Sequence, residues 1–187
     1  MASYFEGEKP IESFAAVVSD VVTAPGAFFE QMPKAETYGS AVYFLSITLA
    51  VPLLIGAMMT LGFSLFFAPV IWLFVLAATW LWAWYLGWAV RVFGKRGLST
   101  QDAFQICAYA NVPVILAWIP ILNVALGLWS LVLEWFGLTR YAHVSSGVAL
   151  LILLVPMIIL MLSMTVLVVL LAVFASQNAT FQEWQVF

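Results

Sequence analysis

Charged side chains are scarce in this 187-residue chain. Only 8% of the residues are Asp, Glu, Lys or Arg, and 65% are hydrophobic, whereas soluble domains carry roughly a quarter charged residues. A water-soluble fold of this length could not hide so much apolar surface. The composition therefore excludes a soluble enzyme or a soluble binding domain, and it predicts an integral membrane protein.

Cysteine and histidine, which bind metals and take part in nucleophilic catalysis, are also few. The chain has one cysteine, Cys107, and one histidine, His143, which excludes an intrachain disulfide, a cysteine cluster and a His-rich metal site. None of the motifs HExxH, GxSxG, CxxC or the phosphate loop occurs. Six basic residues are too few to follow a nucleic-acid backbone. We expect no enzymatic activity, no cofactor, no metal and no nucleic-acid partner.

Long apolar runs are what the chain does have. A membrane-spanning helix needs about 20 apolar residues, and three runs meet that length at about 39–61, 66–90 and 147–175. The part between them is interrupted by Pro113 and Pro120. Two short spans at about 103–118 and 121–138 are predicted there, and a re-entrant hairpin is the alternative. The first of these helices can be capped by Ser99 or Thr100, with Asp102 in its first turn.

With five spans, every basic residue falls on the same side of the membrane: Lys9, Lys34, Arg91, Lys95, Arg96 and Arg140. The positive-inside rule then places the N-terminus in the cytoplasm and the C-terminus outside. We therefore predict an all-α, polytopic bundle of five spans. A cytoplasmic segment, 1–38, precedes the bundle, 39–175, and a short extracytoplasmic tail, 176–187, follows it.

Aromatic residues are concentrated at the end of the second span. Trp80, Trp84 and Trp88 follow one another at intervals of four, so they share one helix face. Tryptophan beside basic side chains is typical of a membrane–water interface. The predicted interface anchors are Trp84, Trp88, Arg91, Lys95 and Arg96, and Trp80 is expected to pack deeper, between helices.

The segment before the first span shows the periodicity of an amphipathic helix. Its predicted apolar face consists of Ile11, Phe14, Ala15, Val18, Val21 and Val22. A second short helix can begin at Pro25 and presents Phe28, Phe29 and Met32. We expect these helices to lie in the headgroup plane or over the cytoplasmic end of the bundle, with docking against protein favoured.

Three stretches resemble the Yip1-domain family of small polytopic membrane proteins, in particular its bacterial members. They are "TAPGAFFEQMP" with Pro25, Phe28 and Phe29, "AYANVPVILAWIP" with Tyr109 and Pro113, and "LWSLVLEWFGLTRYAHVSSGVAL" with Gly137. Family members often carry a basic residue where this chain has Val148. The resemblance implies a helical membrane domain in a bacterial cytoplasmic membrane, while the vesicle-traffic role of eukaryotic members does not carry over.

Polar and small residues follow one face of the fourth predicted span: Asn123, Gly127, Ser130 and Glu134. Because polar groups are costly in lipid, this face is expected to point into the bundle, where Asn111 and Gln105 of the third span could meet it. One hypothesis is a polar cavity with Glu134 as its ionisable group. The other is helix–helix contact, with Glu134 reaching water or pairing with Arg91 or Arg140.

Two functions therefore remain open. The favoured one is a non-enzymatic scaffold or adaptor that organises the membrane or holds other membrane proteins or a second copy of itself. The alternative is a small transporter or channel that uses the polar face of the fourth span. The expected partners are the lipid bilayer and such proteins.

Overall fold

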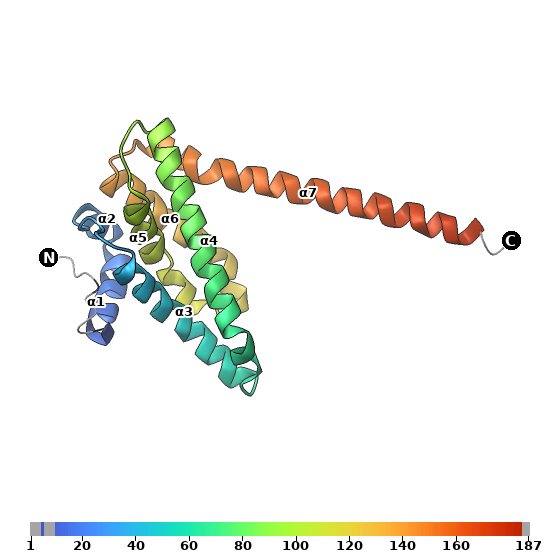
Figure 1. Ribbon diagram of the computed structural model, residues 1–187, viewed down its shortest axis with the longest axis horizontal. Helices are drawn as coiled ribbons and strands as arrows, with labels where there is room; N and C mark the ends of the chain where they lie inside the picture. The colour runs from blue at the N-terminus through green and yellow to red at the C-terminus, as the bar shows by residue number, and fades with distance from the viewer. Residues whose placement is uncertain (1–4, 6–9, 185–187) are drawn as a thin grey trace. The chain divides into compact units, whose positions relative to one another are not determined.

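The computed structural model describes Phe5 and residues 10–184, without the side chains of Pro10, Ser64 and 175–184. These residues form helices and no strand. In chain order they are α1 (Pro10–Thr23), α2 (Pro25–Glu30), α3 (Gly39–Met59), α4 (Phe63–Phe93), α5 (Thr100–Ala110), the 3₁₀ helices η1 (Val112–Leu116) and η2 (Pro120–Leu122), α6 (Asn123–Phe136), the π-helix η3 (Gly137–Tyr141) and α7 (Ser146–Trp184) (Figure 1).

Four helical stretches of the described chain are long and apolar enough to cross a membrane: Gly39–Met59, Leu65–Phe93, Pro120–Tyr141 and Ser146–Phe174. These correspond to the first, second, fourth and last predicted spans, so the protein is an all-helical, multi-pass membrane protein. The third predicted span, 103–118, is not among them. Its residues form the 11-residue helix α5, followed by η1.

The ends of α5 follow from its sequence. Ser99 caps the helix by accepting a hydrogen bond from the Asp102 backbone N–H at 3.0 Å, as predicted. At the other end, Pro113 has no N–H to donate and its ring clashes with a helical carbonyl, so the α-helix stops at Ala110 and continues as a tighter 3₁₀ turn. Residues 102–110 are all buried because α3, α4 and α6 pack around α5.

The turn between α3 and α4 depends on a left-handed backbone. Gly62 has φ 89°, which costs a glycine little, and Leu61 before it has φ 51°. The side chain of Leu61 is 98% exposed. The chain therefore reverses here through a short loop, and the described residues of Met1–Leu150 leave the Leu61 side chain uncovered.

One predicted packing arrangement was wrong, and a second was right only in part. Trp80 is 48% exposed and, like Trp84 and Trp88, faces away from the bundle, because the opposite face of α4, with Ala83 and Leu86, is the one that is buried. In α1 the buried side chains are Val17 and Val21, whereas Ile11, Ala15 and Val22 of the predicted apolar face are exposed. Phe14 and Val18 of that predicted face are half-buried, and Val21 belongs to it as well, so the bundle covers only part of the predicted apolar face of α1.

By contacts the chain divides into two compact units, Met1–Leu150 and Leu151–Phe187. The second unit continues α7 as an apolar helix whose side chains from 157 to 174 are mostly exposed. The helix extends to Trp184, beyond the predicted end of the last span at 175. Residues 185–187 of the predicted tail lie outside the described residues.

Candidate functional site

An aromatic cluster fastens the N-terminal segment to the bundle. The ring of Phe28 in α2 meets Tyr109 of α5 edge-on at 5.1 Å, and Phe44 of α3 meets the same tyrosine at 4.9 Å. Phe14 of α1 lies 5.1 Å from Phe44. Phe28, Phe44 and Tyr109 are at most 1% exposed. The expectation that this segment docks against protein is thus confirmed. Each buried aromatic pair adds apolar contact area between the segment and the bundle.

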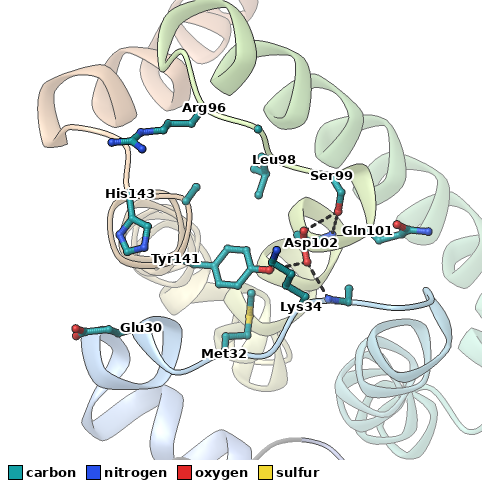
Figure 2. A pocket seen from close by; sticks show the side chains of 13 residues that line it. Glu30, Met32, Lys34, Arg96, Leu98, Ser99, Gln101, Asp102, Tyr141 and His143 are labelled. Carbon is teal, nitrogen blue, oxygen red and sulfur yellow. Dashed lines mark hydrogen bonds between the residues drawn. The ribbon is translucent and has the colours of Figure 1, made fainter.

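A second attachment is made by Asp102 in the first turn of α5. Its Oδ1 accepts hydrogen bonds from the Ala35 N–H at 2.8 Å and from the Tyr141 hydroxyl at 2.6 Å, while the Ser99 hydroxyl donates to Oδ2 at 2.7 Å (Figure 2). Hydrogen bonds to a carboxylate are roughly twice as strong as those between neutral groups. One buried side chain therefore joins the segment before α3, the loop before α5 and the end of η3.

The same three segments enclose a polar cavity of about 790 Å³. Lys34 enters it from the segment before α3, Arg96 from the loop between α4 and α5, and His143 from the loop between η3 and α7 (Figure 2). All three loops consequently lie at the same end of the bundle.

The motif residues that the sequence analysis singled out are placed at contacts between elements. Pro25 begins α2, where its missing N–H costs nothing. Pro113 is buried in η1. Gly137 lies against α5 so closely that a Cβ built on it would overlap Cγ2 of Ile106. Together with Phe28, Phe29 and Tyr109, these residues serve to pack the N-terminal segment and α6 around α5.

A comparison with known protein families identifies the family in which this arrangement of helices occurs. The family model of the Yip1 domain matches residues 19–179. The chain belongs to the Yip1-domain family. No curated protein sequence and no solved structure matches the chain. The match runs from the end of α1 into α7 and includes every motif residue placed above.

The polar face predicted in this Yip1-domain protein is divided by the structure. Glu134 of α6 is buried, and both of its carboxylate oxygens accept from Trp82 Nε1 of α4, at 3.1 and 3.0 Å. Ser130 is partly buried, whereas Asn123 and Gly127 are exposed. Asn111 donates to the Cys107 carbonyl at 2.8 Å. Of the two hypotheses for Glu134, the helix–helix contact had it reaching water or pairing with Arg91 or Arg140. The structure instead pairs it with Trp82.

The predicted interface anchors lie on the outside of the Yip1 domain. Trp84 and Trp88 are 53% and 45% exposed, and Arg91, Lys95 and Arg96 are exposed as well. Arg91 Nε donates to the Gly87 carbonyl at 3.2 Å. The structure adds that Arg96 lines the polar cavity and Lys95, next to it, does not.

Sequence reasoning missed two partners. Asp102 was recognised only as a favourable charge at a helix start, and its bonds to Ala35 and Tyr141 span 67 and 39 residues of sequence. Trp82 lies in the tryptophan-rich stretch at the end of the second predicted span and was not singled out. Its position two residues after Trp80 places it on a different helix face. That spacing was the signal from which a contact with another helix could have been predicted.

Proposed function

We propose that this Yip1-domain protein is a non-enzymatic scaffold or adaptor of a bacterial cytoplasmic membrane, which holds a partner protein on its N-terminal segment. The observation that carries the proposal is the double attachment of that segment, through the aromatic cluster and through Asp102. A segment held at two points is a fixed platform, which loses little conformational entropy when a partner binds.

The proposed topology has five spans with the N-terminus in the cytoplasm. Arg96 and His143 line one cavity, so the chain between them must leave one end of the bundle and return to it. The returning part, Pro120–Tyr141, is long enough to cross the membrane. Residues 100–119 then have to make the outward crossing. At the α-helical and 3₁₀ rises, α5 and η1 together cover about 26 Å of a hydrocarbon core of about 30 Å.

Cysteine accessibility tests this topology. In a Cys107→Ala background, Lys95→Cys and His143→Cys should resist an impermeant thiol reagent in intact cells and react after the membrane is opened. Leu61→Cys, in the turn between α3 and α4, should react in intact cells. Labelling of Lys95→Cys in intact cells, with Leu61→Cys protected, would contradict the proposed orientation.

The surface proposed to receive a partner is the outer face of α1. Ile11 and Val22 are 83% and 49% exposed, and with Ala15 they form an apolar stripe on one side of the helix. Glu12 is exposed beside the stripe, and its charge disfavours contact with anionic lipid. An apolar stripe bordered by an acidic residue suits another protein better than a bilayer surface.

A photo-crosslinking amino acid in place of Ile11 tests the proposal in native membranes. We expect a discrete protein adduct from position 11 and from position 22, because a docked partner covers both. Position 12 on the neighbouring face is the control and should give much less adduct. An adduct of twice the protein's mass would identify the partner as a second copy. Adducts with lipid alone, equal at positions 11 and 12, would refute the scaffold proposal.

Transport, the alternative, would need Asn123 and Ser130 to line one cavity with Glu134. Asn123 is exposed, and eleven helical residues separate it from Glu134 by about 16 Å along the axis. Glu134 accepts from Trp82 across the interface of two helices. This arrangement favours helix–helix contact over a transport path.

A further inference from the structure

The polar cavity lies at the end of the bundle that the proposed topology places in the cytoplasm, and it holds basic side chains that no described residue pairs with. Lys34, Arg96 and His143 line it, and none of their side chains forms a hydrogen bond or ion pair with the described part of the chain. Lys34 and Arg96 are two of the six Lys and Arg residues of the protein, and His143 is its single histidine. Each comes from a different segment, so the fold itself brings them together.

The acidic side chains of the cavity do not neutralise these cations by pairing. Both oxygens of Asp102 are occupied by three donors, and the residue is only 9% exposed. Glu30 is exposed, and Figure 2 shows its carboxylate at the border of the cavity, pointing away from Arg96 and Lys34. The side-chain donors that no described acceptor uses are therefore those of Lys34, Arg96 and His143. Arg96 lies on the same side of the cavity as His143 (Figure 2).

The backbone around the basic residues is held in an unusual conformation. Lys95, directly before Arg96, has φ 51°, and His143 has φ 52°. Residues other than glycine rarely adopt this left-handed region, and such positions persist where the surrounding structure enforces them. His143 lines the cavity itself, and Lys95 directly precedes the cavity residue Arg96 without lining the cavity.

We propose that this cavity binds the phosphate group of an anionic phospholipid headgroup. Arginine and lysine donors without partners are suited to phosphate oxygens, and basic pockets at the cytoplasmic ends of membrane helices receive such headgroups. The cavity, about 790 Å³, has room for a phosphate with its glycerol. A free phosphate would use the same donors, so the lipid and the soluble ion have to be separated by experiment.

The test measures thermal unfolding of the delipidated, detergent-solubilised protein with three probes: short-chain phosphatidylglycerol, phosphatidylcholine of the same chain length, and inorganic phosphate. Lys34→Gln/Arg96→Gln removes two cations from the cavity. Lys95→Gln/Arg140→Gln removes two exposed cations that do not line it, with the same change in net charge. All four side chains are exposed, so both variants should fold.

Phosphatidylglycerol should raise the melting temperature of the wild type and of the control variant, and phosphatidylcholine should not. In the cavity variant the apparent affinity should fall at least about tenfold, since two charge-assisted contacts are lost. An equal response of all three proteins would overturn the site. Stabilisation by inorganic phosphate at the same concentration as the lipid, lost in the cavity variant, would keep the phosphate site and overturn its assignment to a lipid.

Discussion

Replacing Asp102 with alanine is expected to release the N-terminal segment from the bundle. The Ala35 N–H, the Ser99 hydroxyl and the Tyr141 hydroxyl would all lose their acceptor. Leaving hydrogen-bonding groups without a partner costs roughly 1–3 kcal/mol each when they are buried. Since these donors are only partly buried, we expect the free energy of unfolding to fall by about 2–4 kcal/mol.

The most direct measurement is trypsin cleavage after Lys34. The peptide bond that trypsin would cut carries the N–H that Asp102 holds, so the attachment protects the bond itself. Cleavage at this position should be much faster in Asp102→Ala than in wild type, and intermediate in Asp102→Asn, which keeps one acceptor oxygen. Glu36→Ala removes an exposed carboxylate from the same segment and is the control. Unchanged cleavage in Asp102→Ala would mean that the aromatic cluster alone holds the segment.

A single methyl group added at Gly137 is expected to disturb the centre of the protein. The new Cβ would overlap Cγ2 of Ile106 and lie 3.3 Å from its Cγ1. Ile106 is fully buried in α5 and cannot move away without displacing its neighbours. Overpacking of this kind costs about 1–3 kcal/mol. Gly137→Ala should therefore lower the melting temperature in detergent, followed by tryptophan fluorescence.

A double-mutant cycle shows whether the overlap is the cause. Ile106→Ala alone leaves a cavity and should destabilise by about 2–5 kcal/mol. Combined with Gly137→Ala, part of that cavity is filled, so the double variant should be more stable than the sum of the two single effects predicts. Gly127→Ala in α6, the helix directly before η3, meets nothing within 4 Å and should be neutral or slightly stabilising. Strict additivity of the two changes would place the cause elsewhere.

Hydrophobic length and local signals predicted much of the fold. The runs at 39–61 and 66–90 became α3 and α4 because their apolar stretches leave few alternatives in a bilayer, and Ser99 capped α5 as expected. The stretch predicted as the third span forms a short helix followed by a 3₁₀ turn, and neither has the long apolar run from which a helix is predicted. Its burial by three neighbouring helices belongs to the tertiary structure.

The candidate site was less predictable, for the same physical reason. The polar cavity combines residues near positions 34, 96 and 143, each of which is an ordinary loop residue in its own segment. Glu134 was recognised as notable, but its donor, Trp82, is 52 residues away. Periodicity describes one helix face at a time, whereas these contacts depend on which faces meet.

The short, buried α5 also bears on how the protein is made. It has 11 residues and carries Asp102 and Gln105, so it is a poor substrate for the machinery that inserts apolar helices one at a time. Most of its contacts are with α3 and α4, which are synthesised earlier, as is the segment that Asp102 holds, while α6 and Tyr141 follow it in the chain. We therefore expect α5 to enter the membrane late, together with α6, onto a surface that the first half of the nascent chain has already assembled.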